Sequence, residues 1–165
     1  MSLGLELFTL LHVVLSLVGI AAGLVVCWAY RTSQRLEGLT RVFLSSTIAT
    51  SVTGFFFPFE GLRPSHVFGV ISLLVLAVAC VALYRCGLCG RWRWAYVLGS
   101  MIALYLNTFV LVVQVFLKVP GLQTGGQGFG PAFAIVQAVV LVVFIAWTVL
   151  AIARFRPESR GGAVG

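Results

Sequence analysis

Apolar segments of about 20 residues alternate with short polar segments along the whole chain. A helix of about 20 apolar residues crosses the hydrocarbon core of a bilayer, which is about 30 Å thick. The pattern therefore predicts an all-α polytopic membrane protein, a bundle of five transmembrane helices in one domain with a short tail at residues 155–165. The predicted spans cover residues 7–30, 41–57, 65–84, 92–117 and 131–154.

Small and polar residues recur in the first span at steps of three and four positions. Residues with this spacing lie on one face of a helix, and small side chains there let a neighbouring helix approach closely. We therefore expect this face to pack against other helices. Its members are Thr9, His12, Ser16, Gly19, Gly23 and Cys27.

The second span is rich in hydroxyl groups and poorly hydrophobic. Serine and threonine side chains in a membrane bond to neighbouring helices or to backbone carbonyls of their own helix. We therefore expect residues 41–57 to lie inside the bundle. The hydroxyl-bearing positions are Ser45, Ser46, Thr47, Thr50, Ser51 and Thr53.

The fourth span carries a second polar stripe and begins with a cluster of aromatic residues. Trp92, Trp94 and Tyr96 at its start predict an aromatic belt at the membrane–water interface. Polar residues at steps of four and seven then predict a seam along one side of the helix. The residues of this seam are Tyr96, Ser100, Asn107, Gln114 and Lys118.

Composition excludes a soluble protein. Hydrophobic residues make up 61% of the chain and charged residues 9%, against about 45–50% and about 25% in soluble domains. The net charge of +7 does not indicate nucleic-acid binding, because nine of the ten arginines lie in two gaps and a tail that the positive-inside rule assigns to the cytoplasm. We predict a multi-pass protein of the cell membrane with its N-terminus outside and its C-terminus in the cytoplasm.

A polar, phenylalanine-rich corner at residues 50–69 joins the second and third spans. In the predicted topology, two histidines and two glutamines lie in the outer half of the bundle, with an asparagine deeper. Polar groups in hydrocarbon are unfavourable unless they are paired. These residues either hydrogen-bond one another, or line a ligand site, or, for His66, lie in interfacial water. The candidate site residues are His12, His66, Asn107, Gln114, Gln137 and Phe57.

Two classes of ligand fit this set of residues. Two neutral imidazoles from different helices can hold haem b. A quinone-like molecule fits as well, with histidine, glutamine and asparagine as partners of its carbonyl groups and phenylalanines as walls. A two-histidine metal site is less favoured, because Glu6 and Glu60 are the only nearby acidic residues. Either ligand suggests electron transfer, and the alternative is a non-catalytic subunit or scaffold of a larger membrane complex.

Cys86 and Cys89 form a C-x-x-C motif close to the start of the fourth span. Arginines beside such a pair lower thiol pKa values in general. The pair resembles that of membrane thiol oxidoreductases of the vitamin K epoxide reductase type, and the resemblance covers these two residues alone. It implies a thiol enzyme, although the predicted topology places the pair in the reducing cytoplasm. Acidic residues are absent from the predicted spans, which disfavours proton- or ion-coupled transport, and no motif names a reaction.

Overall fold

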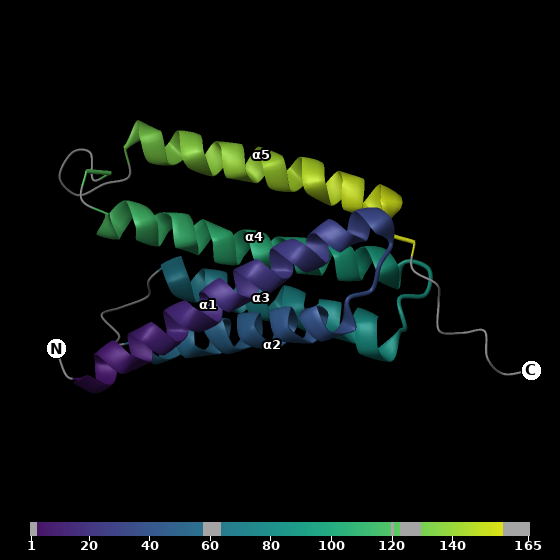
Figure 1. The fold of residues 1–165 in the computed structure, drawn as a ribbon, viewed down its shortest axis with the longest axis horizontal. Coiled ribbons are helices and arrows are strands. Elements are labelled where there is room, and N and C mark those ends of the chain that lie inside the picture. Colours follow the sequence, from purple (N-terminus) through teal and green to yellow (C-terminus); the bar gives the residue numbers. More distant parts are fainter. Residues whose placement is uncertain (1–2, 58–63, 120, 123–129, 157–165) are drawn as a thin grey trace, which may run out of the picture.

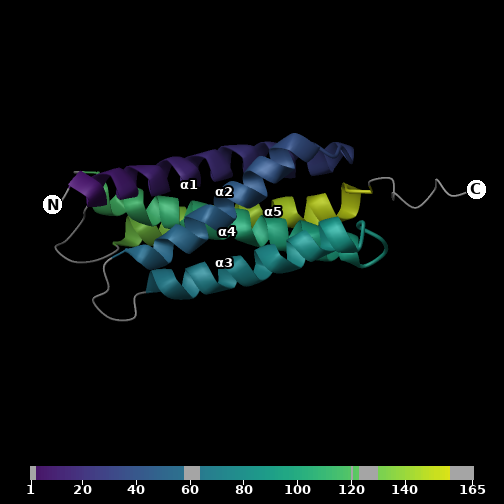
Figure 2. The same cartoon turned by 90° about the horizontal axis from the view of Figure 1, so that it is seen from below.

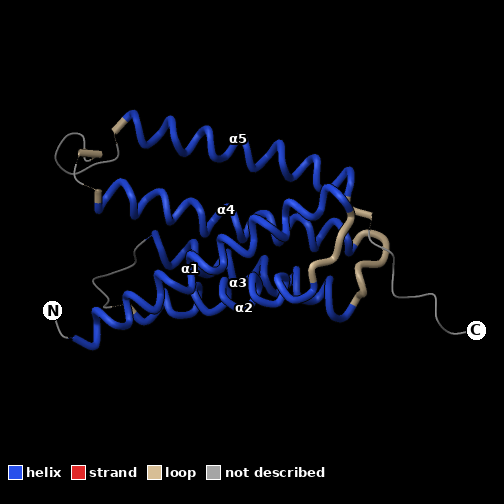
Figure 3. Tube along the Cα trace, viewed as in Figure 1, coloured by secondary structure: helices blue, strands red, loops and turns tan. Residues whose placement is uncertain are grey.

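A computed structural model describes residues 3–57, 64–119, 121–122 and 130–156, which form helices and loops without a strand (Figure 3). The predicted turn at residues 58–63, and most of the predicted loop after residue 118 and of the tail, lie outside these residues. The five α-helices are α1 (Leu3–Ala29), α2 (Glu37–Thr53), α3 (Pro64–Cys80), α4 (Trp92–Lys118) and α5 (Pro131–Arg154). Short turns extend three of them: η1 (Tyr30–Thr32), η2 (Gly54–Phe56) and the π-helical η3 (Val81–Arg85).

The five helices lie side by side along the long axis of the molecule (Figures 1 and 2). α1 packs on α2 and α4, α3 packs on the same two helices, and α5 contacts α4 and η1. We call one end the histidine end, because α1 and α3 begin there with His12 and His66 close to their starts. We call the opposite end the arginine end, because the α1–α2 and α3–α4 connections and the last turn of α5 carry arginines there.

Four helices of the described chain are long and apolar enough to cross a membrane. This finding supports a small multi-span membrane protein whose outer surface contacts lipid. The exposed leucine, isoleucine and valine side chains on the outside of the bundle suit that contact. The four segments are Leu3–Thr32, His66–Arg85, Trp92–Lys118 and Pro131–Arg154.

The remaining helix, α2, has 17 residues and buries four of its hydroxyl-bearing side chains, those of Thr40, Ser46, Thr47 and Thr50. Ser45, which was predicted to lie inside the bundle, is exposed, because it lies on the opposite face of the helix. Ser46 and Thr47 are buried, and their hydroxyls donate to the carbonyls of Val42 at 2.6 Å and Phe43 at 2.7 Å. Thr53 donates in the same way to Ala49 at 2.8 Å. The prediction that these hydroxyls bond to backbone carbonyls within the bundle is confirmed.

The small-residue face of α1 packs against α2 and α4, as predicted. A methyl group added to Gly23 would lie 2.7 Å from Leu104 Cδ1 and 2.8 Å from the ring of Phe43. One added to Gly19 would lie 3.0 Å from the hydroxyl oxygens of Ser46 and Thr47. The spacing of these two glycines therefore sets how closely the three helices approach.

An aromatic cluster closes the core at the arginine end. The ring centroid of Tyr30 lies 5.7 Å from that of Tyr96 and 4.7 Å from that of Phe155. Tyr96 is only 2% exposed, whereas Trp92 and Trp94 are 43% and 49% exposed. The prediction that Tyr96 joins the interfacial belt was wrong, because its face of α4 turns towards η1 and the end of α5 rather than towards lipid.

Candidate functional site

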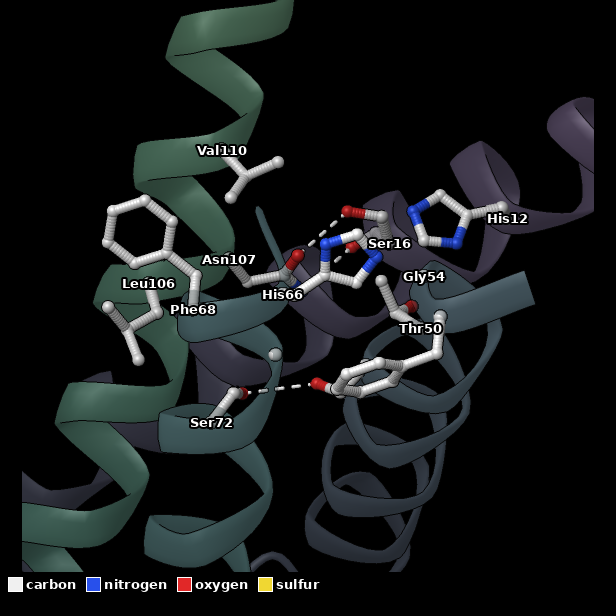
Figure 4. Close-up of a pocket in the computed structure, with 13 residues that line it drawn as sticks. His12, Ser16, Thr50, Gly54, His66, Phe68, Ser72, Leu106, Asn107 and Val110 are labelled. Atoms are coloured by element: carbon white, nitrogen blue, oxygen red, sulfur yellow. Dashed lines mark hydrogen bonds between the residues drawn. The ribbon is translucent and has the colours of Figure 1, made fainter. Parts of the chain in front are cut away.

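A pocket of about 100 Å³ lies towards the histidine end, between α1, α2 with η2, α3 and α4. Figure 4 shows the labelled side chains converging on it from these helices. His12, His66 and Asn107 all line this pocket, so three of the candidate residues lie together. The other polar side chains of its lining are Ser16, Thr50, Ser51 and Ser72.

His12 is oriented by a threonine of α2. Its Nδ1 lies 2.8 Å from the hydroxyl oxygen of Thr53. We assign the one proton of that hydroxyl to the bond with the Ala49 carbonyl at 2.8 Å, which makes His12 the donor to Thr53. The neutral imidazole therefore carries its proton on Nδ1 and its lone pair on Nε2. Phe57 fixes the ring from the side, with the two ring centroids 5.1 Å apart at an interplanar angle of 89°.

Asn107 is buried in the middle of the bundle, where it binds Ser16 of α1. The Ser16 hydroxyl donates to Asn107 Oδ1 at 2.8 Å, and Asn107 Nδ2 points at the Ser16 carbonyl at 3.5 Å. Gly19, one turn further along α1, leaves room for the amide, since a methyl group there would lie 3.4 Å from Nδ2. This pair connects α1 and α4 across the pocket.

The α3 side of the pocket carries His66, Gly69 and Ser72. The His66 ring packs on Phe55 of η2 at 5.8 Å between centroids. Gly69 lets the same phenylalanine approach, because a methyl group there would lie 3.0 Å from the Phe55 ring. One turn deeper, the Ser51 hydroxyl donates to that of Ser72 at 3.1 Å, which joins α2 to α3.

The two glutamines take no part in lining this pocket. Gln137 of α5 is buried, and its Nε2 donates to the carbonyl of Phe109 on α4 at 3.1 Å, so that it connects these two helices. Its Oε1 is buried without a hydrogen-bond partner among the described residues. Gln114 is exposed near the end of α4. The polar seam of α4 is therefore buried at Ser100 and Asn107 and exposed beyond them.

The size of the pocket restricts what it can hold. Ligand sites in proteins usually enclose about 300–1,000 Å³, and an apolar cavity of about 150 Å³ holds one benzene. A haem does not fit into about 100 Å³, whereas a few water molecules do, at about 30 Å³ each. The described residues also contain no group of three histidine, cysteine or acidic side chains placed to hold a metal ion.

The cysteine pair lies at the opposite end of the molecule from this pocket. Cys86 and Cys89 occupy a turn in which the amide of Cys89 donates to the carbonyl of Cys86 at 3.1 Å. The turn uses left-handed backbone at Leu88 and at two glycines. All four cysteines of the chain are free thiols, and Cys89 is exposed. Since α3 and η3 separate the pair from His66 by about 30 Å of helix, the two features form separate regions.

The partners that organise the pocket were not identified from the sequence. Thr53 is the group that orients His12, and Ser72 is the group that receives the hydroxyl of Ser51. Both hydroxyls lie in segments that the sequence marks as polar. Their pairing, however, depends on how far each helix is rotated, which hydroxyl spacing within a single helix does not specify.

Comparison of the chain with known protein families, curated proteins and solved structures finds no match in any of the three.

Proposed function

We propose that this chain is a non-catalytic membrane protein, a structural subunit of a larger membrane assembly. One observation carries the proposal: the polar side chains around the histidine-end pocket bind one another across helices. His12 pairs with Thr53, Ser16 with Asn107, and Ser51 with Ser72, which connects α1 to α2, α1 to α4 and α2 to α3. Side chains used in this way hold neighbouring helices together and stabilise the bundle.

The small size of the pocket supports the same proposal. Thr50 lines the pocket, but its hydroxyl is buried away from the open space, without a hydrogen-bond partner among the described residues. A pocket of about 100 Å³ has room for a few water molecules at about 30 Å³ each, so water rather than a cofactor suits this space.

The proposed topology has five spans, with the N-terminus outside and the arginine end in the cytoplasm. Eight of the ten arginines belong to the arginine end: Arg31, Arg35, Arg41, Arg85, Arg91, Arg93, Arg154 and Arg156. Such an excess marks the cytoplasmic side of a membrane protein. α2 is included as a span because its 17 residues and the 3 of η2 rise about 30 Å, and it lies alongside the other four helices (Figure 1).

Thiol labelling tests the topology. In one variant Cys89 is the sole cysteine, and in another the sole cysteine is introduced as Leu122→Cys at an exposed position after α4. In intact cells an impermeant thiol reagent is expected to modify the second variant and not the first. Modification of Cys89 alone would invert the topology, and modification of both would contradict a single membrane crossing by α4 between the two positions.

Two measurements test the proposed role. Protein extracted from its native membrane in mild detergent is expected to show no visible absorption band and to run, in native mass spectrometry, with at least one further chain. His12→Ala and His66→Ala are then expected to lower the midpoint of unfolding separately, with the double variant showing the sum of the two free-energy changes to within about 0.5 kcal/mol. A monomer that carries a chromophore lost in both variants would refute the proposal.

A quinone-like ring is the second candidate, and the tautomer of His12 favours it. The hydrogen bond to Thr53 leaves the Nε2 lone pair of His12 in the pocket region, where it could accept a bond from a hydroxylated ring. At about 100 Å³, the pocket would have to widen for a single substituted ring. In a Cys-free background, tetramethylbenzoquinol should raise the unfolding temperature if a quinone-like ring binds here, and His12→Ala should then make the increase smaller. No increase with the wild-type pocket residues would refute this second candidate.

A further inference from the structure

A second and larger cavity, of about 370 Å³, opens at the arginine end. Its walls come from the end of α1 with η1, the connection to α2, the first turns of α2, η3, the start of α4, and Phe155 after α5. This volume lies within the range of about 300–1,000 Å³ that is common for ligand sites. The cavity is therefore large enough for a molecule that the histidine-end pocket cannot enclose.

Positive charge dominates the wall of this cavity. Arg35, Arg41 and Arg85 reach it from three separate segments, against a single lining carboxylate, that of Glu37. Glu37 lies 3.9 Å from Arg41, and both side chains are well exposed, so this ion pair is weak. The guanidinium groups thus exceed the carboxylate by two, and a planar guanidinium suits the oxygens of a phosphate group.

Tyr30 lines the cavity, but its hydroxyl is buried beside those of Tyr96 and Ser100 and does not reach the cavity surface. The rings of Tyr30 and Tyr96 therefore close the floor of the cavity. Val26, Leu88 and Phe155 supply apolar surface beside it.

We propose that this cavity binds the phosphate headgroup of an anionic phospholipid. Phosphate oxygens would meet the three arginines, and the first carbons of the acyl chains would lie on the apolar surface. The cavity lies where two apolar segments end, at Thr32 and Arg85, and a third begins at Trp92. Headgroups occupy this level of a membrane, and basic pockets between helices bind them.

Binding of soluble short-chain lipids to the purified full-length protein tests the proposal. Dioctanoyl phosphatidic acid is expected to bind, and dioctanoyl phosphatidylcholine, whose headgroup carries no net charge, to bind more weakly. Arg35→Gln and Arg85→Gln should each weaken phosphatidic acid binding about fivefold. The matched controls are Arg91→Gln and Arg154→Gln, which remove a charge from the same end but outside the cavity lining; each should change binding less than about twofold.

Three outcomes would overturn the proposal. An equal loss in the control variants would indicate attraction to the basic end as a whole, and no loss in Arg35→Gln and Arg85→Gln would place the lipid elsewhere. Inorganic phosphate that binds as tightly as the lipid would assign the site to free phosphate.

Discussion

The two polar regions of this bundle differ in size, in charge and in how their side chains are used. At the histidine end, hydroxyl, amide and imidazole groups bind one another around about 100 Å³. At the arginine end, three guanidinium groups and two tyrosine rings surround about 370 Å³. Polar groups that pair with each other hold helices together, whereas charged groups left facing an open cavity are available to a ligand. The histidines are the candidate site residues in the sequence, yet the arginines line the larger cavity, which is the one with room for a ligand.

Gly99 of α4 lies between the two regions, and changing it should have the largest effect on both. A methyl group there would lie 2.8 Å from the backbone carbonyl of Val75 and 3.1 Å from Ala79 Cβ. Because a backbone carbonyl cannot turn aside, Gly99→Ala should force α3 and α4 apart and lower the free energy of unfolding by about 1–3 kcal/mol. Denaturation in detergent, followed by tryptophan fluorescence, measures this change.

Gly38 provides the matched control for this substitution. It is an exposed helical glycine of α2 with no atom within 4 Å of the position of an added methyl group. Gly38→Ala should leave the stability unchanged or raise it by up to about 1 kcal/mol, because alanine favours the helix. Equal losses at the two positions would contradict close packing of α3 on α4.

A double-mutant cycle between Ser16 and Asn107 sharpens the description of the histidine end. Their hydrogen bond of 2.8 Å joins α1 to α4, and such bonds within membrane bundles average about 0.6 kcal/mol, with a maximum of about 1.7. Ser16→Ala and Asn107→Ala should each destabilise the protein, with a coupling free energy in that range. A coupling close to zero would show that the two groups are satisfied independently, and the scaffold role would lose its support.

Removing the ion pair at the arginine end should have a smaller effect on stability. Arg41 and Glu37 lie 3.9 Å apart with side chains 72% and 47% exposed, and exposed pairs of this spacing contribute about 0.3–0.5 kcal/mol. Arg41→Gln should therefore change the unfolding free energy by no more than this, because that guanidinium faces the cavity rather than a fixed partner. A loss several times larger would mean that Arg41 is a structural residue.

The cysteine pair should have the smallest effect. Cys86→Ser with Cys89→Ser replaces two unpaired thiols of a turn, one of them exposed, and surface substitutions away from special features stay within about 0.5 kcal/mol. Expression and unfolding temperature are expected to match the wild type. A folded double variant that had lost the protein's activity in cells would instead favour a thiol enzyme.

The sequence was sufficient to predict the helices and the packing face of α1. Long apolar runs led to four helices that are able to span a membrane, and the glycines of α1 pack as their spacing indicates. The helix boundaries differ from the predicted ones by up to about one turn. α1 begins at Leu3 rather than at residue 7, and α2 begins at Glu37 rather than at residue 41. Apolar length and small-residue spacing are local properties, which a single sequence reveals directly.

The arrangement of the polar groups could be predicted less well. His12, His66 and Asn107 line one pocket, although Asn107 was predicted to lie deeper. Gln137 turns to α4 and Gln114 is exposed, although both were assigned to the level of the histidines. Depth follows from residue number, whereas the direction of a side chain also depends on helix rotation. The arginine-end cavity was not predicted from the sequence. Its arginines were interpreted as topology signals, and the buried Tyr96 was interpreted as an interfacial residue.

The concealed hydroxyls of α2 have a consequence for how the protein is made. The hydrophobicity of a segment largely determines whether it enters lipid unaided, and α2 is the one described α-helix that does not qualify by length and apolar content. Its polarity is covered after α1 and α3 are in place, at Thr47 and Thr50 among other positions. We expect α2 to enter the bilayer as a hairpin with α1. Ribosome-bound chains that carry, after α2, a tether long enough to bring it out of the ribosome should be membrane-inserted with α1 present and left outside without it.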